Sequence, residues 1–399
     1  MKKTLFTVTL CVFASYLLMA QPSCTKDVEY TLVIQNEVPK ARKMMEEQCF
    51  PGNESSPEVW LLRANVFIKL HQYEVDRKAK DAKYAIRWPD AIITANESFY
   101  KALELKPDIK GTNALLDPKD GQLISAPIIH DLAAKAMEKK DYNEAIKLLN
   151  MVIRSYRVNP KENARYLGYA YIDLANCYKA TGDEANYKKI LLDAVKLNTG
   201  EPNVYLNLYD LYKQEKDTVK CGEILTQARK IIPDAEAINI KSTELDYFAM
   251  IGDTAKLKSA AIKMFEQYKT NVDVIILIAT HLINTKDYSL AEEMIKTGLE
   301  MAPTDFDMNQ LMGYRFYREA LDYVKIMEEL KTQKKYTPAL EFRAKYMETF
   351  KLALPWAEKA YTINSEDRDN NKMLSEIYVR LEMEVPAELN EKVNSYNKQ

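Results

Sequence analysis

Residues 216–234 read KDTVKCGEILTQARKIIPD, a tight turn followed by a helical stretch and a proline, and this pattern recurs in register. The related stretches are GDEANYKKILLDAVKLNTGEP at 182–202, GDTAKLKSAAIKMFEQYKT at 252–270 and KDYSLAEEMIKTGLEMAP at 286–303. The turn aspartates, Asp183, Asp217, Asp253 and Asp287, are spaced 34, 36 and 34 residues apart. A period of about 34 residues with helical patterning indicates a stacked array of helix–turn–helix units.

Within each period, large apolar and small side chains return every three or four residues. In residues 203–234 they are Tyr205, Leu208, Tyr209 and Tyr212, followed by Cys221, Leu225 and Ala228, with Pro233 at the end. A stripe at this spacing is one face of an α-helix. Proline cannot continue a helix, so it marks the boundary of the unit.

This order of large apolar, small and tyrosine positions resembles the tetratricopeptide repeat, over roughly residues 57–385. The resemblance implies an all-α fold, a right-handed α-solenoid of about eight stacked helix–turn–helix repeats. We expect residues 21–56 to form an N-terminal capping region and residues 386–399 a polar C-terminal tail. The repeats are interrupted by an insertion at 71–90, and a degenerate, shortened unit is expected after Gly313.

The first twenty residues, MKKTLFTVTLCVFASYLLMA, have the layout of a bacterial secretory signal peptide: a basic start, an apolar middle and a small last residue. This apolar run is short for a membrane span, which needs about 20 apolar residues. No later stretch is apolar enough either. The sequence therefore predicts a protein exported to the periplasm or the cell surface, with no transmembrane span after removal of residues 1–20.

Cysteine usage fits that prediction. Cys24 and Cys49 bracket the first mature segment, and in an oxidising compartment they could form a disulfide that holds an N-terminal helix. The alternative is a lipid anchor on Cys24, although Gln21, Pro22 and Ser23 match a lipidation motif poorly. Cys177 and Cys221 lie inside repeat helices and are expected to be inert buried thiols.

Catalytic motifs are absent from the sequence. The three histidines, His71, His130 and His281, have no His or Cys neighbour at metal-ligand spacing, and phosphate-binding glycine loops are missing. The formal charge of −2 gives no dense cationic surface for nucleic acid. We therefore predict no enzyme activity, no cofactor, no metal and no nucleic-acid partner. A hydrolase site assembled from distant residues remains open.

The tetratricopeptide resemblance also implies a concave groove lined by the first helix of each unit. Carried over position by position, the groove residues are Tyr169, Ile172, Asn176, Lys179, Asn203, Leu206, Asn207, Asp210 and Lys213. Asn176 and Asn207 match the asparagines that capture a C-terminal carboxylate in such repeats. Ile172, Asn239 and Thr243 stand where that site needs cations, so we do not expect carboxylate capture.

Two turns carry Asp-Thr followed by a small or aliphatic residue, at Asp217-Thr218-Val219 and Asp253-Thr254-Ala255. The pattern resembles one used for periplasmic O-glycosylation in some bacteria, which makes Thr218 and Thr254 candidate glycan sites. The alternative interpretation is structural, because an aspartate at this place caps the following helix.

These features together predict an exported scaffold that binds a protein or peptide partner through a concave groove. Two alternatives stay open: an outer-membrane-tethered accessory factor in glycan uptake or secretion, and a hydrolase with a non-local active site.

Overall fold

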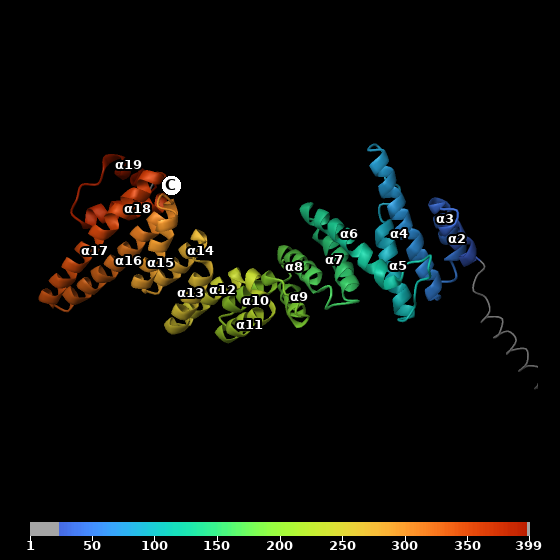
Figure 1. Cartoon of the computed structure of the whole chain (residues 1–399), viewed down its shortest axis with the longest axis horizontal. Helices are drawn as coiled ribbons and strands as arrows, with labels where there is room; N and C mark the ends of the chain where they lie inside the picture. The colour runs from blue at the N-terminus through green and yellow to red at the C-terminus, as the bar shows by residue number, and fades with distance from the viewer. Residues whose placement is uncertain (1–23, 397–399) are drawn as a thin grey trace, which may run out of the picture. The chain divides into compact units, whose positions relative to one another are not determined.

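The computed structural model describes residues 24–396, so the predicted signal peptide at 1–20 lies outside the described residues. In this range the chain consists of helices and turns and contains no β-strand. The helices form successive hairpins, which gives an all-α helical-repeat solenoid and confirms the predicted fold class (Figure 1). The described part of the chain divides into two compact units, with the boundary between Leu211 and Tyr212.

The first unit begins with a short N-terminal region and continues with three helical hairpins, α4/α5, α6/α7 and α8/α9. Its elements are α2 (Cys24–Val33), α3 (Val38–Met44), the π-helical turn η1 (Met45–Cys49), α4 (Pro57–Lys80), α5 (Ala91–Leu105), α6 (Pro118–Glu138), α7 (Tyr142–Tyr156), α8 (Ala164–Ala180) and α9 (Glu184–Lys196). Helix α10 (Pro202–Gln214) contains the boundary between the two units.

The second unit contains three further hairpins, α12/α13, α14/α15 and α16/α17, and ends with the contacting pair α18/α19. Its elements are α11 (Thr218–Ile231), the 3-10 turn η2 (Asp234–Glu236), α12 (Ile238–Met250), α13 (Thr254–Tyr268), α14 (Val272–Asn284), α15 (Tyr288–Met301), α16 (Phe306–Thr332), α17 (Tyr336–Ile363), α18 (Arg368–Arg380) and α19 (Ala387–Tyr396). We call the even-numbered members from α4 to α18 first helices and their successors second helices.

The hairpin turns are built around their aspartates. The backbone N–H of Asp183 donates to the carbonyl of Tyr178 at 2.9 Å, which closes the end of α8. The Asp183 carboxylate accepts the N–H of Asn186 at 3.0 Å, which caps the start of α9. Asp217, Asp253 and Asp287 cap α11, α13 and α15 in the same way. One residue type therefore satisfies free backbone groups on both sides of the turn.

Small residues bring neighbouring helices close together, as at the contact between α15 and α16 of successive hairpins. A Cβ atom on Gly298 of α15 would lie 2.0 Å from the terminal methyl of Met308, which is fully buried. The larger core positions are filled by rings: Tyr171, Tyr205 and Tyr209 are among the largest fully or almost fully buried side chains. These tyrosines therefore serve packing, as the sequence indicates.

A disulfide links the first and last elements of the N-terminal region. Cys24 at the start of α2 and Cys49 at the end of η1 form a disulfide with 5.4 Å between their Cα atoms. The bond ties α2 to the chain segment that leads into α4, and Val28, Ala41 and Met45 in this region have no solvent exposure.

The predicted insertion at 71–90 is half helix and half loop. Helix α4 runs on to Lys80, so only residues 81–90 connect it to α5. The loop is held against α4 by Glu74, which is 1% exposed. The carboxylate of Glu74 accepts the Tyr84 hydroxyl at 2.9 Å and the Arg87 N–H at 2.6 Å. A buried carboxylate requires such donors.

The expectation of a shortened unit after Gly313 is wrong. Helices α16 and α17 have 27 and 28 residues and form a long hairpin. The buried stripe of α17 repeats every seven residues at Ala339, Tyr346, Ala353 and Ala360, so it continues well beyond a helix of ordinary repeat length. Residues 387–396 of the predicted polar tail form α19, whose Leu389 is buried.

Candidate functional site

The predicted groove residues of α8 lie on its accessible side. Tyr169, Asn176 and Lys179 are exposed and Ile172 is half-buried, whereas Tyr171 on the other side of the helix is buried. The Tyr169 hydroxyl accepts a hydrogen bond from Arg165 Nε at 2.7 Å. The Lys179 ammonium lies 5.7 Å from the centre of the Tyr187 ring. The α8 stripe thus presents an aromatic ring, an amide and a cation.

The predicted residues of α10 share this accessibility. Asn203, Asp210 and Lys213 are exposed, and Leu206 and Asn207 are half-buried. The Asn203 amide donates to Glu201 Oε1 at 2.8 Å. Asn176 and Asn207 stand on different helices, α8 and α10. Whether these side chains act together in one groove stays a prediction.

A cavity that the sequence did not indicate is lined by first helices of the second unit. It has a volume of about 510 Å³ and lies among α14, α16 and α18. We call it the first-helix groove. Its lining residues are Thr280, Gln310, Leu311, Tyr314, Tyr317, Asp369, Lys372, Met373 and Glu376. Three consecutive first helices therefore contribute to one hollow surface.

The polar groups of the first-helix groove are held in place by contacts between helices. The Tyr317 hydroxyl of α16 donates to Glu376 Oε2 of α18 at 2.5 Å, and Gln310 Nε2 donates to Asp367 Oδ1 at 2.9 Å. The rings of Tyr314 and Tyr317 stack with their centres 6.4 Å apart. Burial, followed by the bond to Glu376, raises the pKa of Tyr317, so its hydroxyl remains a donor at neutral pH.

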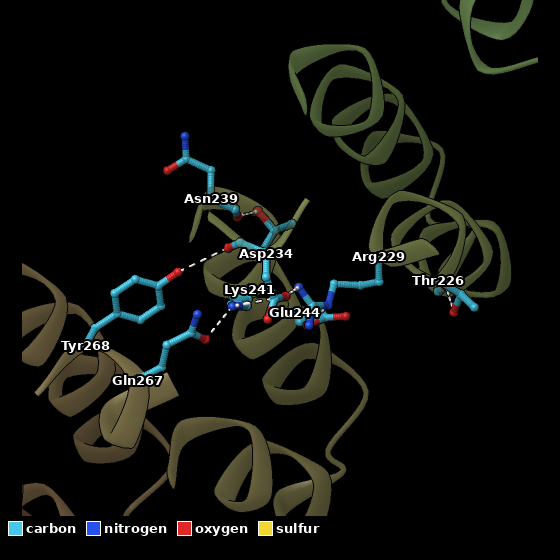
Figure 2. A network of polar contacts seen from close by, with 10 residues as sticks. Thr226, Arg229, Asp234, Asn239, Lys241, Glu244, Gln267 and Tyr268 are labelled. Carbon is cyan, nitrogen blue, oxygen red and sulfur yellow. Dashed lines mark hydrogen bonds and ion pairs between the residues drawn. The ribbon is translucent and has the colours of Figure 1, made fainter. Parts of the chain in front are cut away.

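A second, charged cavity of about 410 Å³ lies among α11, α12 and α13. Figure 2 shows the network at its edge, where Asp234 is surrounded by Arg229, Lys241 and Tyr268. Arg229 Nη1 and Lys241 Nζ lie 3.2 and 3.4 Å from Asp234 Oδ1. The Lys241 ammonium also donates to Gln267 Oε1 at 2.5 Å. The two cations, Lys241 first, lower the pKa of Asp234.

Glu244 is the second carboxylate of this charged cavity. Its Oε2 atom lies 3.7 Å from Arg229 Nε. Burial raises the pKa of Glu244, while Arg229 and Lys241 oppose that shift. The contact between Arg229 and Glu244 is longer than a hydrogen bond. Arg229 is shared between Glu244, which is largely buried, and Asp234, which is exposed.

Two of the histidines connect first helices instead of forming a reactive cluster. His130 Nε2 of α6 lies 2.7 Å from Asp173 Oδ2 of α8, and His281 Nδ1 of α14 lies 3.6 Å from Asp246 Oδ1 of α12. Within residues 24–396, no group of three or more His, Cys, Asp and Glu side chains is arranged to hold a metal ion. None of the helices described has the length and apolar character of a membrane span.

The two candidate glycan sites, Thr218 and Thr254, lie at hairpin turns. Thr218 and Thr254 are the first residues of α11 and α13 and are exposed. The aspartates before them cap these helices by accepting the N–H groups of Lys220 and Lys256, each at 3.0 Å. The capping contact explains the aspartates, and glycosylation of the threonines stays a proposal. Intact-mass analysis of the native protein tests it, since unmodified Thr218 and Thr254 would contradict it.

Cys177 and Cys221 are buried and form no disulfide. Burial raises the pKa of Cys177 to about 11, with Asp173 adding to the shift. A thiol with that pKa is a poor nucleophile at neutral pH.

Known proteins resemble this chain only in structure. No family model matches it, and no curated protein sequence does either. Among solved structures it is similar to Pseudomonas aeruginosa PilF, at 14% identity and a TM-score of 0.28, over 61% of this chain and 92% of that one. It is similar to yeast Tom70 at 12% identity and a TM-score of 0.40, over 96% and 86% of the two chains. The TPR2AB domain of yeast Sti1, solved as a pHSP90 complex, matches at 15% identity and a TM-score of 0.22, over 78% and 98%.

The repeats of this chain are marked by turn aspartates spaced 34, 36 and 34 residues apart that each cap a second helix, with small residues where helices meet. The chain is an all-α helical-repeat solenoid. The surfaces of this solenoid differ in their charge and in which helices line them.

Sequence reasoning missed both cavities of the helical-repeat array. The first-helix groove could have been found by carrying the groove positions forward into the unit of Gly313, where Tyr314 and Tyr317 follow. The repeat pattern is weakest in that unit, which hides its groove positions. The charged cavity leaves no local signal, because Arg229, Lys241 and Gln267 come from three helices.

Proposed function

We propose that this protein is an interaction scaffold that binds a polypeptide in the first-helix groove. The observation that carries the proposal is the cavity of about 510 Å³ lined by α14, α16 and α18. A surface contributed by three consecutive first helices is the arrangement in which helical repeats hold an extended partner.

The chemistry of the groove suits a polypeptide. Tyr314 and Tyr317 offer half-buried aromatic faces, Leu311 and Met373 supply buried apolar contacts, and Lys372 is exposed. Aromatic residues with a polar rim are typical of protein-binding surfaces. The Tyr317–Glu376 bond fixes one ring before a partner arrives, so less conformational entropy is lost on binding.

Site-specific photocrosslinking tests the proposal. A photoreactive residue at position 280 in the groove is expected to crosslink a partner in envelope extract, and Tyr314→Ala is expected to abolish that crosslink. Tyr336 serves as the matched control, because it is a tyrosine that is 64% exposed on α17 outside the groove. Crosslinking that is equal in Tyr314→Ala and Tyr336→Ala would contradict the proposal.

The predicted stripe on α8 and α10 is proposed as a further contact surface. Tyr169→Ala and Asp210→Ala are expected to weaken capture of the same partner, since both side chains are exposed. If the partner binds both variants as tightly as the unmodified protein, the stripe is not a contact surface and binding is confined to the second unit.

We also propose that the protein is exported. Two features support this: the signal-peptide layout of residues 1–20 and the Cys24–Cys49 disulfide, since disulfides persist in oxidising compartments. The disulfide disfavours the lipid-anchored alternative, because a sulfur bonded to Cys49 cannot also carry a thioether lipid. Mass analysis of the mature protein tests this: a chain that begins near Gln21 with the disulfide intact is expected, and a lipidated Cys24 would overturn it.

The two remaining alternatives lack support in the described part of the chain. No feature of residues 24–396 favours an accessory role in glycan uptake or a hydrolase activity over protein binding.

A further inference from the structure

The charged cavity continues into a second hollow along the same helices. That hollow has a volume of about 770 Å³ and shares Phe248 and Lys256 with the charged cavity. Together they form one surface, which we call the α11–α13 trough. Its two sides come from the second helices α11 and α13, and its floor comes from α12. It is therefore distinct from the first-helix groove, with which it shares no lining residue.

The trough carries an excess of positive charge. Its lining includes the cations Arg229, Lys230, Lys241, Lys256 and Lys263, and the carboxylates Glu223, Asp234 and Glu244. Five cations face three carboxylates, although the chain as a whole has a formal charge of −2. The trough is thus a local exception to the charge balance of the protein.

The internal ion pairs neutralise these cations only in part. The side chain of Lys241 is 9% exposed, whereas that of its partner Asp234 is 69% exposed. An exposed carboxylate is screened by water, so it offsets the field of a buried ammonium incompletely. Lys256 pairs with Asp253 at 2.9 Å. Among residues 24–396, Lys230 and Lys263 have no carboxylate within ion-pair distance and remain available to a ligand.

The floor of the trough is aromatic. The rings of Tyr247 and Phe248 lie 5.6 Å apart and are half-buried. Gly222 of α11 lets the Tyr247 hydroxyl pack directly against that helix, because a Cβ atom there would lie 2.4 Å from it. Val219 on the same helix is 69% exposed. An apolar side chain could therefore pack between flanking positive charges.

The length of the trough fits a short polypeptide better than a small anion as its ligand. Its α11 side extends from Val219 to Lys230, which at about 1.5 Å per residue corresponds to about 16 Å. An extended polypeptide advances about 3.3 Å per residue, so about five residues would fill it.

We propose that the α11–α13 trough binds a short acidic polypeptide segment that carries an apolar residue. Its carboxylates would meet Lys230 and Lys263, and its apolar side chain would pack on Phe248. The protein would then hold two partners, or two segments of one partner, through the trough and the first-helix groove independently.

Fluorescence anisotropy with a labelled peptide tests the proposal directly. The probe is Asp-Glu-Asp-Leu-Glu-Asp-Glu, and the comparison peptide has lysine at every acidic position. We expect the acidic peptide to bind with an affinity that falls as salt is raised, and the lysine peptide not to bind. The double variant Lys230→Glu and Lys263→Glu is expected to weaken binding at least about tenfold.

The controls separate the trough from its surroundings. Lys269 follows directly on the helix that carries Lys263, is exposed and does not line the trough, so Lys269→Glu should bind like the unmodified protein. Tyr314→Ala in the first-helix groove should also bind normally, which makes this test independent of the proposed function. Circular dichroism confirms that each variant is folded.

Three results would overturn the proposal. They are the absence of acidic-peptide binding at about 1 mM protein in low salt, equal binding by the lysine-to-glutamate double variant, and tighter binding of a single-stranded oligonucleotide that displaces the peptide.

Discussion

At the scale of single residues, the turn aspartates explain why the repeat register is so regular. Each one accepts an N–H at the start of a second helix while its own N–H closes the preceding helix, as Asp253 does with Lys256 and Phe248. Helix ends leave four donors or acceptors without partners, so a residue that satisfies both ends is favoured at this place. Asp305 and Asp367 likewise cap the starts of α16 and α18 with their carboxylates.

Asp305→Ala should reduce the free energy of unfolding by about 1 kcal/mol, because the N–H of Met308 loses its acceptor at 2.8 Å. Urea unfolding followed by circular dichroism measures the change. Asp305→Ser keeps a capping oxygen and should retain most of the stability. Equal losses in the alanine and serine variants would show that capping is not the cause.

At the scale of helical elements, close approach depends on where glycine and alanine stand. Gly121 of α6 packs directly against the ring of Phe99 of α5, which is fully buried. Small side chains also lie in the buried stripe of α17 in the long α16/α17 hairpin, at Ala339, Ala353 and Ala360. Helix pairing is therefore decided by the sizes of facing side chains.

Gly121→Ala should destabilise the protein by about 1–3 kcal/mol, because the new Cβ would lie 2.3 Å from the Phe99 ring. This loss is expected even though alanine favours a helix by about 1 kcal/mol over glycine. Thermal unfolding measures it. The double variant Gly121→Ala with Phe99→Leu should recover part of the loss, and a double variant no more stable than the single one would contradict the packing explanation.

The contact between α12 and α14 should depend on pH. Burial lowers the pKa of His281, with Asp246 opposing the shift. The unfolded chain, in which the pKa is about 6.5, then binds more protons than the folded chain. Stability should therefore fall as pH drops through the unfolded pKa and level off below the lowered folded pKa.

Urea midpoints measured between pH 8 and pH 5 check this expectation. His281→Asn should reduce the loss of stability over that range, while His71, whose pKa is also lowered by burial, continues to contribute. An unchanged pH dependence in His281→Asn would contradict the assignment to this residue.

At the scale of the whole molecule, the chain is two compact units with different means of stabilisation. The second unit relies on apolar packing among α12–α19, with fully buried residues such as Ile278, Ala291 and Phe350. The first unit adds a covalent bond between Cys24 and Cys49, which closes a segment with a sequence separation of 25 residues. A cross-link of that length contributes about 3 kcal/mol by restricting the unfolded chain.

Replacing both Cys24 and Cys49 with serine should loosen α2 and η1 while leaving the second unit unchanged. Hydrogen–deuterium exchange is expected to rise in residues 24–49 and to stay constant in α14–α18. Unchanged protection of residues 24–49 would show that packing around Val28 and Met45 holds this region without the disulfide.

The sequence alone determined the repeat architecture, because helix periodicity, turn aspartates and helix-ending prolines act over a few neighbouring residues. It located the second helices, because one face of a helix follows from spacing, whereas the groove predicted on α8 and α10 stays a prediction. It misjudged the unit after Gly313, where the helices α16 and α17, of 27 and 28 residues, are longer than those of a 34-residue repeat. Only the tertiary structure revealed the first-helix groove and the α11–α13 trough. Tyr317 meets Glu376, and Lys241 meets Asp234 and Gln267, only after separate helices pack, and no local pattern specifies which side chains face each other across that packing.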